Sequence, residues 1–459
     1  MKERNSAEPE RLSLSQNHAE EVAPDDPLLG GNPVRVVHPS VEHLHGPEEV
    51  TYEADELVVV CLVRDGRPYV KSFVEHYASM GVKHMVFLDN GSTDGTVEAL
   101  KEYANVTVLR TALPFKRYAL LVRQYLIERF GRGRWSLCVD IDELFDYPYS
   151  DIVGLGSLLS YLNEGSYTAV VAHMLDMFPE EPLSVGVRAS EHPDEPLKER
   201  HRFYDVSNIS RISLRGHPLF RNNTLESDEV EALRGGIRQT LFGFRANLTK
   251  FPLVFSDGKV QPFDGSTHWV DNARIADLTC VLFHYKFLDG YLREQAAQAV
   301  REEHHYDNSA EYKKYLQVLE GNPTLQVKQE TAREIHSVND LLENGFLIVS
   351  EGYVGWVNAE EEKSVLLQPA IQGEQRWPAD AFLKARRQDR TKTLKVRRLE
   401  RQLLKRDLKI RNSKHNQRLL KKRIRILERQ LQSVRSSRSW RLLNKLGGIR
   451  ARVSKGRKR

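Results

Sequence analysis

Two short clusters of acidic residues have the residue types and spacing best suited to chemistry. One is the run DIDE at 140–143, which follows an apolar stretch. Alternate side chains of an extended chain share a face, so we expect Asp140 and Asp142 to project together. Two carboxylates on one face suit a hard divalent cation, which keeps coordination positions for phosphate oxygens. Acidic residues also follow strands as helix caps, so both a metal site and a structural role are open for this pair.

The other cluster is DNGSTDGT, which starts at Asp89 and also follows an apolar run. Gly91 and Gly95 permit tight-turn geometry, and Asp94 suits the N-terminal cap of a following helix. Turn and cap geometry therefore explain the second half of the cluster. They leave Asp89 and Asn90 unexplained, and we interpret Asp89 as a residue that binds a ligand.

Both clusters fall at the ends of predicted strands. Continuous apolar runs predict the strands, and apolar residues at helical spacing predict the helices between them. Such alternation is typical of an α/β fold with a mostly parallel sheet and helices on both faces, in which ligands bind beyond the carboxyl ends of the strands. The predicted strands are 57–63, 84–89, 106–111 and 135–145, and the predicted helices are 68–81, 96–104 and 117–130.

The later part of the chain is less regular, and we expect it to carry the parts that face the acceptor substrate. It contains predicted strands at 169–177 and 280–287 and a predicted helix at 291–303. The polar composition at the start of the chain predicts a disordered leader. The predicted organisation is a leader at 1–52, an α/β domain at 53–350 with halves at 53–150 and 151–350, a linker at 351–383 and a tail at 384–459.

The composition is that of a globular cytoplasmic protein. The chain of 459 residues is long enough for a full core, since domains commonly contain about 100 to 200 residues. Cys61, Cys138 and Cys280 lie in apolar runs without metal-ligand spacing, so we interpret them as reduced core residues. The start of the chain lacks the apolar segment of a secretory signal, and no run of about 18 apolar residues predicts a membrane span.

Charge is divided sharply along the chain. Residues 384–459 contain 30 Lys and Arg against 4 Asp and Glu, a net charge of +26, whereas the rest of the chain has a net charge of −21. Apolar residues of the tail alternate at spacings of three and four, which predicts a coiled coil or a long amphipathic helix and, through it, a homo-oligomer. These residues are Val396, Leu399, Leu403, Ile410, Leu420, Ile424, Leu427, Leu431 and Val434.

The basic tail predicts an anionic partner. It has no zinc pattern and no RNP-like aromatic motif, so only nonspecific attraction to nucleic-acid phosphates would follow. Attraction to anionic lipid contributes about 1 kcal/mol per basic residue near the surface. The segment SSRSWRLLNKLGGIR at 436–450 places Trp440 and several leucines among arginines, which is typical of an interfacial helix. We therefore expect the tail to bind an anionic membrane surface.

The two acidic clusters together resemble a known family. The stretch from VVVCLV at 58–63 through DNGSTDGT, followed by SLCVDIDELF at 136–145, resembles the nucleotide-sugar-binding half of family 2 glycosyltransferases with the GT-A fold. The resemblance covers about residues 56–147. A weaker similarity extends through HYKF at 284–287 toward a bacterial branch with an IDEF-like motif.

This resemblance implies that the half at 53–150 binds a nucleoside diphosphate sugar. Asp89 would accept hydrogen bonds from the nucleotide base, and Arg64 and Asp65 would lie near the base and the ribose. Asp94, in the same turn as Asp89, would belong to the donor-binding residues.

The resemblance also implies a metal site next to the diphosphate. Asp140 and Asp142 would hold Mn²⁺ or Mg²⁺, and His284 would be the late histidine that GT-A enzymes often supply to the metal. Lys286 would meet phosphate on the same face, and Arg123 would meet the diphosphate. A satisfied core histidine and a solvated helix charge stay open as structural explanations of His284 and Arg123.

An inverting transfer needs a carboxylate that takes the proton from the acceptor hydroxyl. The candidates for this base are Asp176, which ends a predicted strand, and Asp228 or Glu229 in the run LESDEVEALRGG. His268 is a further candidate for a role in the acceptor site.

We therefore predict a metal-dependent, inverting glycosyltransferase that moves a sugar from a nucleoside diphosphate sugar to a surface-glycan or lipid-linked acceptor. We expect it to be cytoplasmic and peripheral on the inner face of the cell membrane. One alternative is another metal-dependent nucleotide enzyme, such as a nucleotidyltransferase, although the sequence lacks the phosphate loop GxxxxGK[ST]. The other alternative is a non-catalytic coiled-coil or nucleic-acid-binding scaffold.

Overall fold

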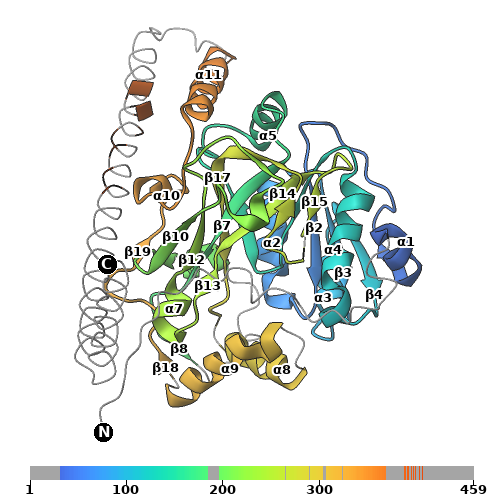
Figure 1. The fold of residues 1–459 in the computed structure, drawn as a ribbon. Coiled ribbons are helices and arrows are strands. Elements are labelled where there is room, and N and C mark those ends of the chain that lie inside the picture. Colours follow the sequence, from blue (N-terminus) through green and yellow to red (C-terminus); the bar gives the residue numbers. More distant parts are fainter. Residues whose placement is uncertain are drawn as a thin grey trace, which may run out of the picture. The chain divides into compact units, whose positions relative to one another are not determined.

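A computed structural model describes residues 32–184, 196–263, 265–288, 290–302, 306–322 and 324–367, with scattered single residues between 387 and 406. The chain divides into two compact units, Met1–Arg376 and Trp377–Arg459. The first unit is an α/β body built around a ten-stranded sheet (Figure 1). The order across this sheet is β1 (Val41–His45), β4 (Val106–Thr111), β3 (His84–Asp89), β2 (Val58–Val63), β5 (Trp135–Cys138), β14 (Thr249–Phe255), β7 (Ala169–Asp176), β17 (Arg274–His284) and β11 (Thr224–Leu225), with β6 (Glu143–Asp146) paired to β17.

The large sheet is mixed, with a parallel majority. Strands β2, β3, β4 and β5 are parallel to one another, and β7, β17 and β11 form a second parallel group. Strand β14 joins the two groups and is antiparallel to both of its neighbours, so the groups run in the same direction. Their carboxyl ends therefore meet at one edge of the sheet, as the sequence pattern predicts.

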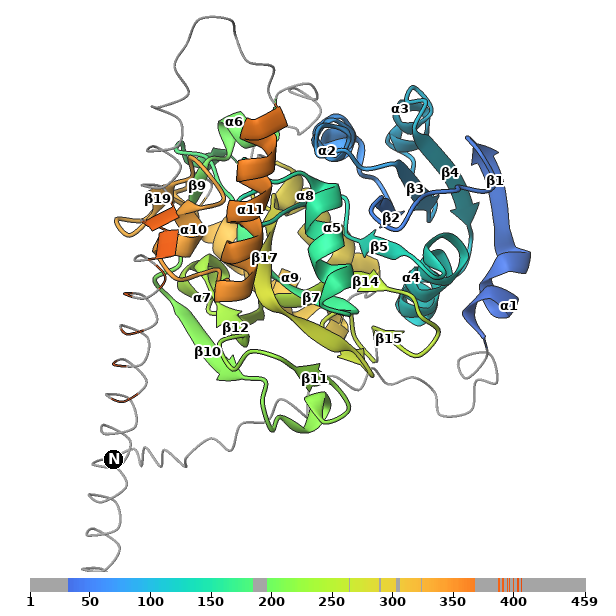
Figure 2. The ribbon, with the colours of Figure 1, turned by 90° about the horizontal axis from the view of Figure 1, so that it is seen from above.

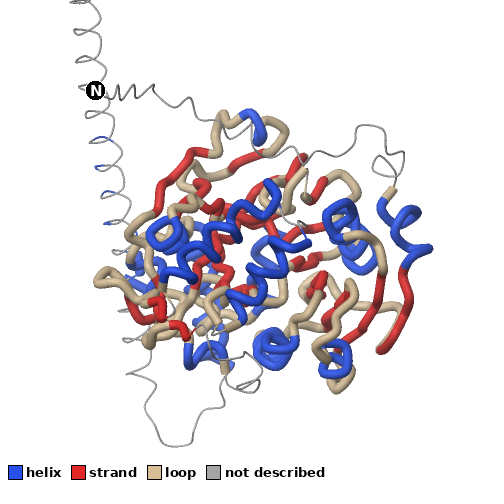
Figure 3. The backbone as a smooth tube through the Cα atoms, turned by 90° about the horizontal axis from the view of Figure 1, so that it is seen from below, coloured by secondary structure: helices blue, strands red, loops and turns tan. Residues whose placement is uncertain are grey.

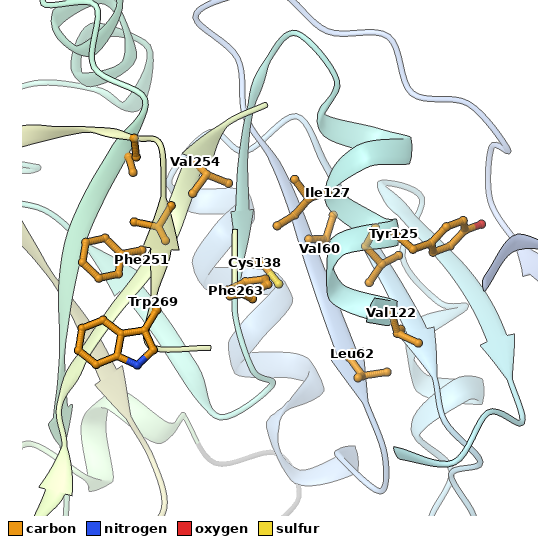
Figure 4. Close-up of a cluster of buried hydrophobic side chains, with 14 of the residues drawn as sticks. Val60, Leu62, Val122, Tyr125, Ile127, Cys138, Phe251, Val254, Phe263 and Trp269 are labelled. Atoms are coloured by element: carbon orange, nitrogen blue, oxygen red, sulfur yellow. The ribbon is translucent and has the colours of Figure 1, made fainter. Parts of the chain in front are cut away.

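Helices cover the N-terminal half of the sheet on both faces. Figure 2 shows α2 (Arg67–Ser79) and α3 (Thr96–Leu100) on one side of the strands and α4 (Phe115–Gly131) on the other. Buried apolar side chains join β2 to α4, among them Val60 and Leu62 of the strand and Val122 and Ile127 of the helix (Figure 4). Each such side chain contributes about 1.5 to 3 kcal/mol when it is fully buried, which fixes α4 against the sheet.

The C-terminal half adds smaller sheets and further helices. The three-stranded sheet contains β10 (Ile209–Ser213), β12 (Glu231–Gly235) and β13 (Ala246–Asn247), and the two-stranded pairs are β15 (Gln261–Pro262) with β16 (Val270–Asp271), β18 (Thr324–Leu325) with β8 (Leu183–Ser184), and β19 (Arg333–Glu334) with β9 (Phe203–Tyr204). The helices are α5 (Leu155–Glu164), α6 (Leu197–Arg200), α7 (Ile237–Phe242), α8 (Tyr291–Glu302), α9 (Tyr306–Gly321), α10 (Asp340–Glu343) and α11 (Glu351–Leu367).

The predicted disordered leader is wrong for its second part. Helix α1 (Pro33–Val37) packs on α4, and β1 pairs with β4 at the outer edge of the sheet (Figures 2 and 3). The side chain of Tyr52 is buried and donates a hydrogen bond to the carbonyl oxygen of Phe130. These contacts are made with residues far along the chain, which a local composition does not reveal. Residues 1–31 of the predicted leader lie outside the described residues.

Two further boundaries differ from prediction. The predicted strand at 135–145 is two strands, β5 and β6, separated by a turn at 139–142. The predicted linker at 351–383 begins with helix α11, whose Trp356 donates a hydrogen bond from Nε1 to Oγ of Ser157 at 2.9 Å. The remaining linker positions, 368–383, lie outside the described residues.

The second unit contains the predicted coiled coil, of which the structure describes only scattered positions. Val396, Leu399 and Leu403 are helical and exposed there. The other predicted seam residues lie outside the described residues. In the described part of the chain, no helix is both long enough and apolar enough to cross a bilayer.

The hydroxyl of Tyr77 connects helix α2 to the strand that follows the acidic turn. It donates a hydrogen bond to the carbonyl oxygen of Glu143 at 3.0 Å and accepts one from the amide of Phe145 at 2.9 Å. Tyr77→Phe should lower the free energy of unfolding by about 1 to 3 kcal/mol, because both buried backbone groups lose a partner. Urea unfolding followed by circular dichroism measures the loss.

Tyr118→Phe is the matched control, because the Tyr118 ring is also buried and its hydroxyl forms no hydrogen bond within the described residues. Its free energy of unfolding should stay near that of the wild type. Equal losses in the two variants would contradict the role assigned to the Tyr77 hydroxyl.

Candidate metal and donor site

Strand register assembles the centre of the site. His284, the last residue of β17, lies opposite Glu143 of β6 on one side and opposite Asp176 of β7 on the other. The amide of Tyr285 donates a hydrogen bond to the carbonyl oxygen of Asp142 at 2.9 Å, which fixes the acidic turn beside the end of β17. The site therefore lies at the carboxyl ends of the strands, where ligands of open α/β sheets bind.

The imidazole of His284 lies between two carboxylates. Its Nε2 is 3.2 Å from Oδ2 of Asp142, and its Nδ1 is 2.5 Å from Oδ1 of Asp176. Burial opposes protonation of the ring, but the two carboxylates outweigh burial and raise the pKa of His284 to about 9. Burial likewise opposes the charge of Asp142, and His284 lowers the pKa of that carboxyl.

Asp140 has different neighbours from Asp142. Its Oδ1 accepts a hydrogen bond from Nη2 of Arg123 at 2.7 Å, and its Oδ2 accepts one from Nζ of Lys250 at 2.8 Å. Lys250 also donates to Oε1 of Glu143 at 2.6 Å. Burial opposes the charge of Asp140, but Lys250 and Arg123 hold its pKa well below the usual range. Both oxygens of Asp140 are thus already bound by cations.

The two acids of the pair therefore have different partners. The prediction that Asp140 and Asp142 project from one strand face is wrong, because the chain turns at Asp140 to Asp142 instead of continuing as a strand. The turn sends Asp140 toward Arg123 and Lys250, and it sends Asp142 toward His284.

Asp142 and His284 are suitable ligands for one divalent cation. Adjacent ligands at about 2.1 Å from a common ion are about 3 Å apart, close to the 3.2 Å between Oδ2 and Nε2. Asp176 would then hold the other ring nitrogen, as the partner carboxylates of metal-bound histidines do. Among the described residues, no group of three or more His, Cys, Asp or Glu side chains is arranged to hold a metal ion. The protein thus offers two ligands, and an ion there would need further ones from substrate or water.

The two loops that follow β2 and β3 are tied to each other. The amide of Thr93 donates to Oδ1 of Asp65 at 2.7 Å, and the amide of Asp65 donates to Oγ of Ser92 at 2.8 Å. Asp94 accepts hydrogen bonds from the amides of Arg67 at 2.9 Å and Thr96 at 3.0 Å, so it caps the starts of both following helices. Arg64 lies beside Asp65, with Nε 3.7 Å from Oδ2.

Asp89 is the residue whose interpretation changes most. Its carboxylate is fully buried and accepts hydrogen bonds from the amides of Gly91 and Ser92 and, at 3.0 Å, from Nε of Arg110. Asn90 donates to the carbonyl oxygen of Leu113 at 2.9 Å. The interpretation that turn geometry leaves Asp89 and Asn90 unexplained is therefore wrong, although contact between Asp89 and a nucleotide base stays a prediction.

Tyr291 of α8 contacts the loop that follows β2. Its hydroxyl donates a hydrogen bond to the carbonyl oxygen of Asp65, and its ring meets that of Tyr69 edge-on at 5.4 Å between centroids. Burial raises the pKa of Tyr291, and the charges of Asp142, Asp94 and Asp65 raise it further. The phenol therefore lies close to acids from both clusters.

Lys286, two residues after His284, belongs to a cluster of charged side chains that also contains Glu311 and Arg238. Its Nζ is 3.3 Å from the hydroxyl of Tyr312 and 3.8 Å from Oε1 of Glu311. Glu311 also accepts a hydrogen bond from Nη1 of Arg238 at 3.3 Å, and Nε of Arg238 donates to Oδ2 of Asp176 at 2.9 Å.

Three charged residues of the site were missed by the sequence analysis. A lysine inside the apolar run TKFPLVF was a signal for Lys250, since an unpaired lysine is rarely buried. Arg238 and Glu311 give no such signal, because charges on helices are usually solvated.

The predicted catalytic bases lie in different surroundings. Asp176 is buried, and burial disfavours its charge, but Arg238 and His284 outweigh burial and lower its pKa, so it binds protons poorly. Asp228 is exposed and pairs with Arg215. Asp228 and Glu229 follow β11, which pairs with the Arg274 end of β17. Their role as the catalytic base stays a prediction.

His268 lies near the site but is bound to the backbone. Its Nδ1 is 2.8 Å from the carbonyl oxygen of Thr249, the residue before Lys250. Its role at an acceptor stays a prediction.

Comparisons with known proteins do not identify a family. No protein-family model matches the chain, and no curated protein matches it. One partly similar solved structure is a nucleotidyl transferase from Methanothermobacter thermautotroptrophicus, with 13% identity over 28% of this chain and 64% of that one and a TM-score of 0.17. Another is UDP-glucose pyrophosphorylase complexed with UDP-glucose, with 9% identity over 33% of this chain and 67% of that one and a TM-score of 0.18. The chain thus spans just under two thirds of the first structure's length, and likenesses this weak assign no activity.

Lys250 neutralises two neighbouring carboxylates in the interior. Lys250→Met keeps the length of the side chain but leaves Asp140 and Glu143 without their shared cation. Loss of one partner from a buried ion pair typically costs about 3 to 5 kcal/mol, and we expect a decrease in unfolding free energy of that size. Chemical denaturation at neutral pH measures it.

The control variant is Lys83→Met, which removes a lysine from an exposed pair with Glu56. Exposed pairs contribute little, so its denaturation midpoint should hardly move. A Lys250→Met protein as stable as the Lys83→Met protein would show that Lys250 is not required to balance the acidic turn.

Proposed function

We propose that this protein is a metal-dependent glycosyltransferase of the GT-A type. It would transfer a sugar, with inversion, from a nucleoside diphosphate sugar to a surface-glycan or lipid-linked acceptor. The observation that carries the proposal is the placement of Asp142 and His284 3.2 Å apart at the carboxyl ends of the sheet, with Asp176 on the far ring nitrogen. The sequence resemblance supports the same reaction.

In this proposal each residue of the centre has a separate task. Asp142 and His284 would hold Mn²⁺ or Mg²⁺, and Asp176 would keep Nε2 of His284 directed at the ion. A divalent ion held there would supply positive charge against the charge that develops on the leaving nucleoside diphosphate. Lys250 and Arg123 keep Asp140 ionised and fix the acidic turn. The two loops that carry Asp65 and Asp94 would face the nucleoside.

Metal-dependent cleavage of nucleotide sugars tests this function. We expect hydrolysis of a matching nucleoside diphosphate sugar with Mn²⁺ and none with EDTA. Asp142→Asn and His284→Gln should each lower the rate by about 100-fold or more, since loss of a second-shell partner alone costs 10 to 100-fold. Isothermal titration with Mn²⁺ should show weaker binding in both variants. A thermal-shift screen of UDP, GDP and dTDP selects the nucleotide.

Asp277→Asn is the matched control, because Asp277 also lies on β17 but accepts hydrogen bonds from the Tyr161 hydroxyl. Its rate and Mn²⁺ affinity should be unchanged. The products separate the alternative activities: glycosyl transfer releases a nucleoside diphosphate, whereas a nucleotidyltransferase forms or consumes pyrophosphate. Wild-type rates in both Asp142→Asn and His284→Gln would exclude the proposed metal ligands.

We also propose that the basic tail binds the inner face of the cell membrane. The +26 charge of residues 384–459 is the support for this placement. The full chain should float with vesicles that contain phosphatidylserine and stay in solution with neutral vesicles. A chain that ends at Arg376, the last residue of the first compact unit, should float with neither. Salt-sensitive DNA binding without flotation would instead favour the scaffold alternative.

A further inference from the structure

Two buried cations next to the proposed metal ligands share a single carboxylate. The side chains of Arg238 and Lys286 are 6% and 9% exposed. Oε1 of Glu311 lies 3.3 Å from Nη1 of Arg238 and 3.8 Å from Nζ of Lys286. Cations buried this deeply are usually balanced by paired anions, because their desolvation costs several kcal/mol. Here Glu311 faces both of them, and Arg238 has a second carboxylate partner in Asp176.

The donors of this pair are not all used. A guanidinium has five N–H groups and a lysine ammonium has three. Nη2 of Arg238 is buried and has no hydrogen-bond partner among the described residues. An unpaired buried donor costs free energy, so the arrangement suits an anion with more acceptor oxygens than one carboxylate provides.

One side chain, that of Asp176, connects Arg238 to the proposed metal ligand His284. Nε of Arg238 holds Oδ2 of Asp176, whose other oxygen holds His284. Lys286 follows His284 by two residues. An anion bound by this pair would therefore lie near the proposed metal ligands.

Glu311 is the partner best able to move. Its side chain is 22% exposed, more than either cation, and it belongs to α9, next to α7, which carries Arg238 (Figure 1). The hydroxyl of Tyr315, one helical turn further on, donates to the same carboxylate. An arriving anion could thus replace the Glu311 carboxylate while the buried cations keep their places.

We propose that Arg238 and Lys286 form a phosphate-binding subsite and that the carboxylate of Glu311 occupies it in the ligand-free protein. The identity of the phosphate as the diphosphate of a nucleotide sugar rests on the proposed function. The subsite itself requires only an anion with several acceptor oxygens, which an arginine fork and a lysine bind well. Ligand binding would then release Glu311 and loosen α9 at this point.

Titration with inorganic pyrophosphate in EDTA tests the subsite without metal, nucleotide or turnover. Glu311→Gln keeps an oxygen for Tyr315 but removes the competing charge, so pyrophosphate should bind about 3 to 10-fold more tightly than to the wild type. Lys286→Gln in the otherwise wild-type protein should weaken pyrophosphate binding by at least about 3 to 10-fold relative to the wild type. Isothermal titration calorimetry measures both.

Glu320→Gln, an exposed change on the same helix, should leave pyrophosphate affinity unchanged. If Glu311→Gln does not fold, the loss expected for Lys286→Gln still decides the matter. Unchanged or weaker affinity in folded Glu311→Gln, or unchanged affinity in Lys286→Gln, would overturn the subsite.

The pyrophosphate titration tests the subsite independently of the nucleotide-sugar cleavage that tests the proposed function. Tighter pyrophosphate binding by Glu311→Gln, in a protein that cleaves no nucleotide sugar, would support the subsite and reject the transferase. Metal-dependent cleavage with no change in pyrophosphate affinity would reject the subsite alone.

Discussion

The register of β17 against its two neighbours is the constraint on which the site depends. At the last residue of the strand, His284 lies opposite Glu143 of β6 and opposite Asp176 of β7. Side chains alternate along a strand, so a slip of one residue would turn the imidazole of His284 to the other face of the sheet. The ring would then be separated from the carboxylates of Asp142 and Asp176. Eleven residues of β17, ten of them buried or half-buried, hold that register.

Charge balance in the interior is the second constraint. The buried carboxylates of Glu143 and Asp176 have Lys250 and Arg238 beside them, and the half-buried Asp140 has Lys250 and Arg123. Buried ion pairs contribute little net stability. We therefore interpret this network as fixing the positions of the acidic side chains. Within the DIDE run, Asp140 and Glu143 share Lys250, whereas Asp142 lies beside His284, which is the pair used in the proposed metal site.

Local features of the fold could be predicted because they depend on local pattern. The strands at 84–89 and 106–111 have the predicted bounds, and the turn after the first has glycines with positive φ at Gly91 and Gly95. Residues whose partners lie far along the chain could not be interpreted from local pattern. Arg110 accounts for Asp89 from a neighbouring strand, and β4 orders the segment at 41–45 by pairing with it. Neither partner is visible in the composition of the segment itself.

The sequence by itself determined the order of strands and helices between residues 57 and 138, the acidic turns at strand ends and the division between an acidic body and a basic tail. These follow from periodicity, turn chemistry and charge, which are properties of short windows. Only the tertiary structure decided which acid meets which cation. Lys250 reaches Asp140 across 110 residues, and His284 reaches Asp176 across 108. Such pairings are set by strand register, because side chains far apart in the chain meet only where the sheet aligns them.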